Sequence, residues 1–147
     1  MKNGLLILLV SLLCSGYSTA EEVKWYDWNE AQTLAEAQNK PIMVFVYASW
    51  CHICQRMDTK VFTDAKVASF LNNNYIPVKL DAEFSGELLK EGNTYTAMKL
   101  LAEITDDQFR GIPAYVFIPK KSNKKSTLVA GLKDPQEMSK LLKKYKK

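Results

Sequence analysis

The stretch PIMVFVYASWCHIC, residues 41–54, joins an apolar run to two cysteines that are separated by two residues. Residues 41–47 are almost all aliphatic or aromatic, which is typical of a strand buried on both faces. After Cys54 the apolar residues recur at helical spacing as far as Phe62. The stretch therefore predicts a buried strand that runs into a helix, with Cys51 at the start of that helix.

Patterns on both sides of this stretch predict one α/β domain. The strands are too apolar to face water, so the expected fold class is a central mixed β-sheet with helices on both faces. No Pro/Gly/Ser-rich linker divides the chain. The expected elements, in order, are a helix over 28–39, a strand over 41–47, a helix from Cys51 with a second piece over 64–71, a strand over 75–81, one broken helix or two short helices within 85–106 around Gly92-Asn93, strands over 112–118 and 127–130, and a helix over 135–145 capped by Asp134.

Residues 1–20 have the features of a cleavable signal peptide. Lys2 precedes an apolar run over residues 4–13, and small residues stand at the end of the segment. The run is about half the length that a membrane span needs. We therefore expect a signal peptide over 1–20, a mature domain over 21–147, and export to the periplasm, an oxidising compartment. An uncleaved membrane anchor and a lipid attached to Cys14 are the alternatives left open.

Charge is unevenly distributed along a chain whose formal net charge is +4. Residues 120–147 hold ten lysines against Asp134 and Glu137, a net charge of +8, whereas residues 21–119 carry −5. A lysine-rich terminal helix is usually a solvated surface, and this is the expectation here. Docking on an acidic partner or on an anionic membrane surface is the alternative, and nucleic acid is not expected as a partner.

Cys51 and Cys54 suit disulfide exchange better than a structural or metal-binding role. A disulfide between them closes a very small loop, so it adds little stability. A zinc site needs four ligands, and the mature chain supplies only two cysteines and His52, so no metal is expected unless two subunits share a site. Cysteine-protease chemistry fails because the one histidine adjoins the nucleophile in sequence instead of approaching it through the fold.

The start of a helix favours the thiolate of Cys51. Unpaired backbone N–H groups and the helix dipole stabilise the anion, which lowers the pKa of Cys51 below the value of about 8.5 of a free thiol. Cys54 lies one turn later and is expected to be more buried, from where it resolves a mixed disulfide. When protonated, His52 would stabilise the Cys51 anion further; the alternative is an exposed residue without a special role.

The segment FVYASWCHIC, residues 45–54, resembles the active-site segment of the thioredoxin superfamily, and Gly111-Ile112-Pro113 resembles its cis-proline loop. The similarity spans residues 28–145. Within the superfamily, residues 41–67 resemble the exported thioredoxin-like proteins and the C-terminal reductase domain of DsbD. The resemblance implies a thioredoxin-like fold and a thiol-disulfide oxidoreductase.

The same resemblance implies roles for the residues around the pair. It assigns the attack on a partner's disulfide to Cys51. It places Pro113 in the cis form facing the thiols, with the backbone of Ile112 holding the partner's chain. Trp50 would shield the centre, with a buried core tryptophan as the alternative. Ile53, as one of the two residues between the cysteines, would tune the redox potential.

The sequence also departs from the family. Phe45 stands where cytosolic thioredoxins carry a buried aspartate that assists proton transfer at the second cysteine. Lys79 matches the usual lysine partner of that acid, and without the acid it is expected to be only a surface residue. The proton route for Cys54 therefore stays open, and Glu83 is the one candidate.

The expected function is reduction of disulfides in exported proteins, since Ile112 before the proline and the context of Trp50 resemble the reducing branch of the superfamily. In an oxidising compartment this needs an electron donor, expected to be a membrane protein of the DsbD type. No cofactor is expected, and the protein is expected to be a monomer. A disulfide oxidase or isomerase, which His52 favours, and a non-catalytic thioredoxin-fold binding module are the alternatives.

Overall fold

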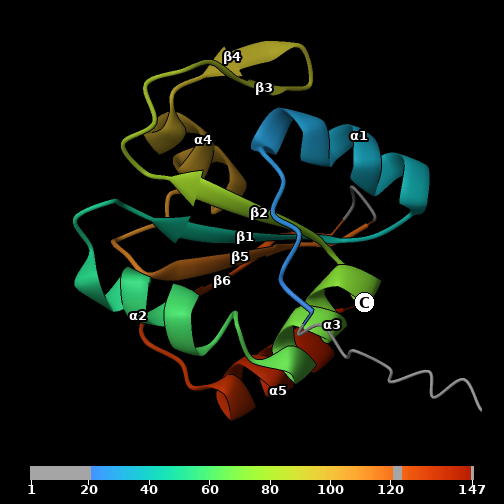
Figure 1. Cartoon of the computed structure of the whole chain (residues 1–147). Helices are drawn as coiled ribbons and strands as arrows, with labels where there is room; N and C mark the ends of the chain where they lie inside the picture. The colour runs from blue at the N-terminus through green and yellow to red at the C-terminus, as the bar shows by residue number, and fades with distance from the viewer. Residues whose placement is uncertain (1–20, 121–123, 147) are drawn as a thin grey trace, which may run out of the picture.

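The computed structural model describes residues 21–120 and 124–146. The predicted signal peptide and Cys14 therefore lie outside the described residues. Figure 1 shows a twisted central sheet covered by helices. The elements are α1 (Trp28–Gln38), β1 (Ile42–Tyr47), α2 (His52–Lys60), α3 (Ala65–Asn74), β2 (Ile76–Asp81), β3 (Leu88–Lys90), β4 (Asn93–Tyr95), α4 (Ala97–Ile104), β5 (Ala114–Ile118), β6 (Thr127–Ala130) and α5 (Pro135–Tyr145).

The central sheet has the strand order β2-β1-β5-β6. β1 pairs in parallel with β2 and antiparallel with β5, and β5 pairs antiparallel with β6, so the sheet is mixed, as predicted. β2 contains Pro77 and lies at the edge of the sheet, where a strand tolerates a residue that cannot donate a hydrogen bond. The inner position of β1 accounts for its unbroken apolar run.

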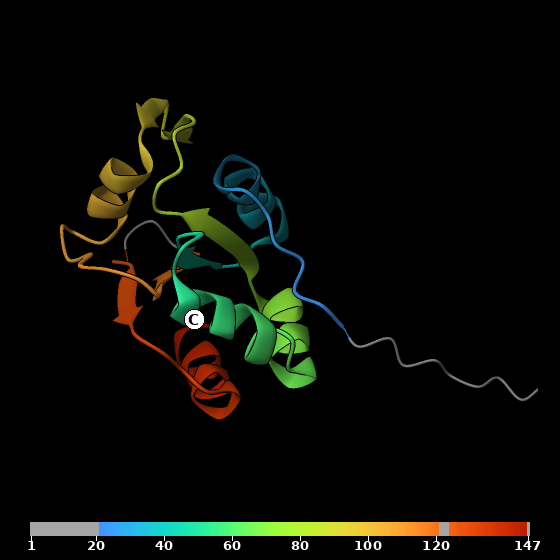
Figure 2. The same cartoon turned by 60° about the vertical axis from the view of Figure 1, so that its left-hand side comes forward.

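Both faces of β1 are covered by helices. Val44 and Val46 belong to the core shared with α1 and α4. Met43 and Phe45 belong to the core shared with α2, α3 and α5. Figure 2 shows the two helical layers on opposite sides of the sheet, which confirms the predicted fold class. Among the residues described, no helix has both the length and the hydropathy that a membrane span requires.

The segment 85–106 differs from the prediction in its first half. Residues 88–95 form a β-hairpin of β3 and β4, and only α4 is helical. Glu91 and Gly92 both have positive φ angles, 51° and 79°, and they make the two-residue turn that fits the twist of a hairpin. The prediction of helices on both sides of Gly92-Asn93 was therefore wrong, because glycine here supports a turn between strands.

Hydrogen bonds from α1 hold the hairpin in place. Trp28 Nε1 donates to the carbonyl of Leu89 at 2.8 Å. The N–H of Leu89 donates to Asn29 Oδ1 at 2.8 Å. The hairpin therefore depends on partners in a distant part of the sequence, and local patterns do not reveal them.

The helix predicted over 64–71 is longer than expected and continues as α3 to Asn74. The Asn73 amide donates to the Ser69 carbonyl at 2.8 Å, and the Asn74 amide donates to the Phe70 carbonyl at 2.8 Å. These side chains thus bond to the preceding turn and extend the helix instead of ending it.

Candidate active site

Cys51 is the N-cap residue of α2, just after the chain leaves β1. Its N–H donates to the carbonyl of Ala48 at 3.1 Å, which closes the turn between strand and helix. The N–H of Cys54 donates to Cys51 Sγ at 3.2 Å. An amide hydrogen bond and the positive end of the α2 dipole therefore both act on the Cys51 sulfur.

Cys51 and Cys54 are joined by a disulfide, with their Cα atoms 5.2 Å apart. Cys51 is 7% exposed and Cys54 is 1% exposed. The order of burial agrees with the sequence prediction, but Cys51 is less open than expected for an attacking thiol. The disulfide accounts for this, because it holds the Cys51 sulfur over the first turn of α2.

The loop that contains Pro113 lies at the same edge of the sheet. The Ile112–Pro113 peptide bond is cis. Ala114 begins β5 and pairs with Val46 near the end of β1, so Pro113 lies beside the segment that leads to the cysteines. Ile112 is half-buried and packs against both cores. The fold thus brings the cysteine segment and the cis-proline loop to one edge of the sheet.

The residues next to the cysteines are largely open to solvent. Trp50 is 61% exposed and Ile53 is 51% exposed. His52, the first residue of α2, is also exposed. Trp50 is therefore not the buried core tryptophan that the sequence left possible. Two apolar side chains border the thiol pair and give it an apolar surrounding.

Leu132 belongs to the same surroundings and was missed in the sequence. It is 45% exposed. It follows Gly131, whose N–H donates to the carbonyl of Pro113 at 2.8 Å, so the chain passes the cis-proline loop at this point. The sequence signal that could have located Leu132 is the predicted hairpin of strands 112–118 and 127–130, which the structure shows as β5 and β6. In an antiparallel pair the residues that follow the second strand lie beside the start of the first strand. We call Trp50, Ile53 and Leu132 the apolar rim.

Beneath the pair the structure places aromatic side chains instead of an acid. Phe45 is fully buried and stacks on Tyr115, with ring centroids 5.8 Å apart. Among the described residues, the Tyr115 hydroxyl has no hydrogen-bond partner. Burial raises the pKa of Tyr115 above its ordinary value. The position of the family's buried aspartate is therefore apolar in this chain.

Lys79 is more than the surface residue that the sequence predicted. Its Nζ lies 2.6 Å from Asp58 Oδ2, and both side chains are 28% exposed. The ammonium group also lies 4.8 Å from the ring centroid of Tyr47. Asp58 is one helical turn after Cys54, a spacing visible in the sequence but not used there. Glu83, the predicted candidate for a proton route, is exposed, and its N–H donates to Asp81.

The hollows described in the structure lie away from the thiol pair. Two hollows of about 700 Å³ and 150 Å³ have none of the predicted site residues in their linings. In residues 21–120 and 124–146, no three histidine, cysteine or acidic side chains gather as metal ligands would. The chemistry that the arrangement offers is thiol-disulfide exchange at the N-terminus of α2, where Cys51 is the more exposed of the two cysteines.

Parts of the chain are similar to longer proteins. It is 39% identical over 62 residues to spermatogenesis-associated protein 20 of Rattus norvegicus, which covers 42% of this chain and 8% of that protein. It is 40% identical over 45 residues to the thiol:disulfide interchange protein DsbD of Citrobacter koseri, which covers 31% of this chain and 8% of that protein. The chain therefore spans only a small part of these curated relatives.

Solved structures share the fold over most of the chain. A thioredoxin from Thermus thermophilus superposes with a TM-score of 0.64 at 25% identity, covering 84% of this chain and 86% of that one. A DsbH oxidoreductase superposes with a TM-score of 0.62 at 20% identity, covering 86% and 85%. The oxidised C-terminal domain of DsbD from Neisseria meningitidis gives 0.58 at 16% identity, covering 83% and 99%.

These superpositions confirm the thioredoxin-like fold that the resemblance implied. A family model named Thioredox_DsbH matches residues 14–140, a range that includes both cysteines and the cis-proline loop. The chain thus belongs to the family described as "Protein of unknown function, DUF255", within the thioredoxin superfamily.

Proposed function

We propose that this protein is a periplasmic thiol-disulfide oxidoreductase that reduces disulfides in exported proteins. The observation that carries the proposal is the Cys51–Cys54 disulfide at the N-terminus of α2, at the same sheet edge as the cis-proline Pro113. A redox-active pair needs one sulfur that ionises easily and a second one within bonding distance. The N-cap position supplies the first, and the next turn of the helix supplies the second.

The reaction begins with both cysteines reduced. The Cys51 thiolate attacks one sulfur of a partner's disulfide, which forms a mixed disulfide and releases the partner's other sulfur as a thiolate. Cys54 then loses its proton, and its thiolate attacks Cys51 Sγ. This forms the Cys51–Cys54 disulfide and releases the partner's second thiolate, so two electrons have passed to the partner. A donor dithiol of the membrane DsbD type returns the pair to the reduced state.

The surface around the pair suits extended segments of partner proteins. The apolar rim offers contacts to apolar side chains, and the backbone of Ile112 offers hydrogen bonds to the partner's main chain. Because Trp50, Ile53 and Leu132 are exposed side chains, the surroundings of the pair suit protein segments laid across the surface. His52 and Ile53 set the redox potential of the pair, and Trp50 shields it from water.

The proposed cellular setting rests on the signal-peptide pattern of residues 1–20. Residues 1–20 direct export and are removed, and residues 21–147 work in the periplasm as a monomer. A lipid anchor at Cys14 is the second possibility for the N-terminus. Comparing the mass of the protein recovered from the periplasm with that of a chain starting at Glu21 separates the two cases.

Reduction of insulin by dithiothreitol tests the activity. The protein should speed the precipitation of insulin well above the rate with dithiothreitol alone, and Cys51→Ser should abolish this acceleration. In protein prepared with residues 1–20 retained, Cys14→Ser is the matched control, because it removes the one cysteine outside the pair, and it should remain active. A wild-type rate equal to dithiothreitol alone, or a fully active Cys51→Ser variant, would remove the proposal. Partner binding that survives Cys51→Ser would instead favour a binding module.

The direction of electron flow is tested by the redox potential. Equilibration with glutathione should give the Cys51–Cys54 pair a redox potential of about −270 mV, the value of a reducing thioredoxin. A potential between about −120 and −180 mV would identify an oxidase or isomerase instead. His52→Ala should make the pair more reducing, because it removes a group that stabilises the thiolate when protonated.

A further inference from the structure

The domain has two opposite poles. The thiol pole holds the end of β1, Cys51 and Pro113. The opposite pole holds the start of β1 and the end of β5, since Ile42 pairs with Ile118. Figure 1 shows the ends of α1 and α3 on this second side, away from α2. Anything bound to the second pole therefore leaves the thiol pair uncovered.

Lysines gather at the second pole from three parts of the sequence. Lys40 precedes β1, and Lys120 and Lys124 lie in the connection from β5 to β6. The last turn of α5 reaches the same place, since Tyr145 lies 4.8 Å from Phe117 between ring centroids. We call this surface the basic pole; its described lysines are Lys40, Lys120, Lys124, Lys125, Lys143, Lys144 and Lys146.

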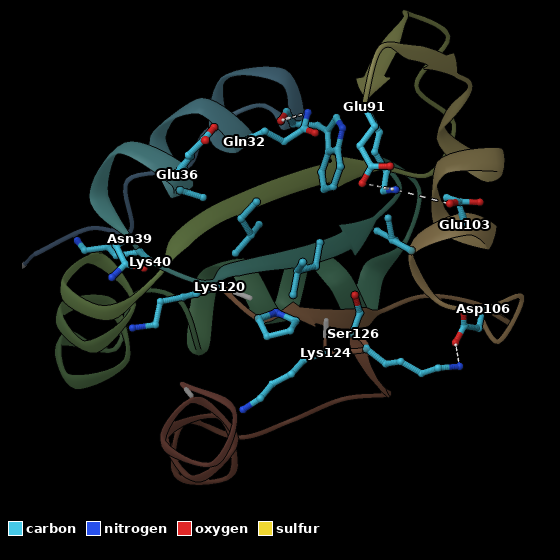
Figure 3. Close-up of a pocket in the computed structure, with 18 residues that line it drawn as sticks. Gln32, Glu36, Asn39, Lys40, Glu91, Glu103, Asp106, Lys120, Lys124 and Ser126 are labelled. Atoms are coloured by element: carbon cyan, nitrogen blue, oxygen red, sulfur yellow. Dashed lines mark hydrogen bonds and ion pairs between the residues drawn. The ribbon is translucent and has the colours of Figure 1, made fainter. Parts of the chain in front are cut away.

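The larger hollow opens at the basic pole and has separated charges. Figure 3 shows Lys40, Lys120 and Lys124 at one end. The acids at the other end are already paired: Glu91 and Glu103 with Lys90, and Asp106 with Lys125. Glu36 is the lining carboxylate drawn on the basic side. The basic end thus keeps an excess of positive charge.

The smaller hollow adds a second basic site. Lys124, Lys125 and Lys144 line it together with aromatic and hydroxyl side chains, and its lining holds no acid. Its volume of about 150 Å³ is large enough for a phosphate group. In the described part of the chain, neither Lys124 nor Lys144 makes an ion pair with a carboxylate.

The chain also enters the domain at the basic pole. The Asn72 amide, near the end of α3, donates to Glu21 Oε1 at 3.2 Å and to the Glu22 carbonyl at 2.8 Å. Lys146 Nζ lies 5.7 Å from the ring centroid of Phe70 on the same helix. These two glutamates lower the positive charge of the pole but leave lysines in clear excess.

We propose that the basic pole binds the surface of membranes that contain anionic phospholipids and holds the thiol pole away from the lipid. Every cation in residues 120–147 is a lysine, a compact point charge that suits phosphates spread over a surface. Lysines near an anionic bilayer contribute additively to binding. An acidic protein partner is less well matched, because the charges are spread around a pole with two separate hollows.

Vesicle binding tests the proposal with the proposed mature chain, residues 21–147. Binding to phosphatidylcholine vesicles is compared with binding to vesicles in which about one third of the lipid is phosphatidylglycerol. The preference for the anionic vesicles is the measured quantity, because it reports the part of binding that depends on charge. Wild type should prefer the anionic vesicles, and added salt should weaken the preference.

Two triple variants with equal charge loss locate the surface. Lys143→Gln, Lys144→Gln and Lys146→Gln together should weaken binding to anionic vesicles on the order of a hundredfold. Lys60→Gln, Lys66→Gln and Lys99→Gln remove three exposed lysines elsewhere and should change binding less than about threefold. The proposal would be overturned if the two triple variants lost the same amount of binding to anionic vesicles, or if wild type showed no preference for anionic vesicles.

Alkylation of the bound protein tests the orientation. Iodoacetamide should modify reduced Cys51 equally fast on vesicles and in solution, whereas strong protection on vesicles would contradict the orientation. Cys51→Ser should bind vesicles as wild type does. The outcome is therefore independent of whether the protein is a reductase.

Discussion

At the scale of single residues, the position of Cys51 in the backbone accounts for the reactivity proposed for its thiol. As the N-cap of α2 it receives the N–H of Cys54 on its sulfur at 3.2 Å. A negative charge on this sulfur strengthens that hydrogen bond and interacts favourably with the helix dipole. Cys54 has no such position and is almost fully buried. The two thiols are therefore chemically unequal, which an exchange reaction in two steps requires.

Replacing the second cysteine should trap the first step of the reaction. Cys54→Ser leaves Cys51 able to attack but removes the thiol that releases the partner. In extracts of the compartment where the protein works, this variant should accumulate mixed disulfides that dithiothreitol cleaves. Non-reducing electrophoresis followed by mass spectrometry detects them and identifies the acceptors. Cys51→Ser with Cys54→Ser is the control, and adducts that persist in it would contradict the assignment.

Two buried tyrosines make a matched pair for a stability test. The Tyr75 hydroxyl donates to the Leu142 carbonyl at 2.7 Å, whereas the Tyr115 hydroxyl has no partner among the described residues. Tyr75→Phe should lower the free energy of unfolding by about 1 kcal/mol, and Tyr115→Phe should leave it unchanged or raise it by up to about 1 kcal/mol. Urea unfolding measures both. Equal losses of unfolding free energy in the two variants would mean that the Tyr115 hydroxyl does have a hydrogen-bond partner in solution.

At the scale of elements, the sequence predicts best where the pattern is local. The run of β1 and the helical spacing after Cys54 lie within one short stretch, so strand, helix and thiol positions all followed from it. The hairpin of β3 and β4 was missed because its strands have three residues each, and their stabilising partners, such as Trp28, lie 61 residues away. The link between Lys79 and Asp58 was missed for the same reason, since it joins β2 to α2 through space.

That ion pair should contribute measurably to the docking of α2 on the sheet. Asp58→Asn and Lys79→Met should each lower the free energy of unfolding by about 1 kcal/mol, because each leaves the other charge half-buried and unpaired. In a double-mutant cycle the two changes should be coupled by about 0.5 to 1 kcal/mol. Lys79→Met keeps the alkyl stem, so the lost charge is what the cycle measures. Strict additivity would show that the pair is not formed in solution.

At the scale of the whole molecule, the fold separates two surfaces. The ends of the strands that lead to Cys51 and Pro113 form the thiol pole, and the opposite ends collect lysines around two hollows. The excess of lysine near the C-terminus was visible in the sequence, but its place relative to the thiols was not. That relation depends on the direction of each element in the sheet, which only the three-dimensional arrangement gives.

The whole molecule should lose stability in alkaline solution. Burial raises the pKa of Tyr75 and of Tyr115 above the ordinary 10.0, so the unfolded chain loses these protons at a lower pH than the folded one. Below about pH 10 these two tyrosines should add no pH dependence to the free energy of unfolding. Above about pH 10 each should lower it by about 1.4 kcal/mol per pH unit. Urea unfolding across this range measures the slope, and Tyr75→Phe with Tyr115→Phe should flatten it. An unchanged slope in the double variant would refute this origin.

The central claim is that, once the disulfide is reduced, the fold keeps the Cys51 thiol ionised and accessible, so that it can attack the disulfide of a partner. The most direct test is the pH dependence of iodoacetamide alkylation of Cys51 in the reduced Cys54→Ser variant, where no second thiol of the pair interferes. The account predicts rapid alkylation with a midpoint at least about one pH unit below the value of about 8.5 of a free thiol. A midpoint at about 8.5, or a thiol that iodoacetamide does not reach in the folded protein, would contradict it.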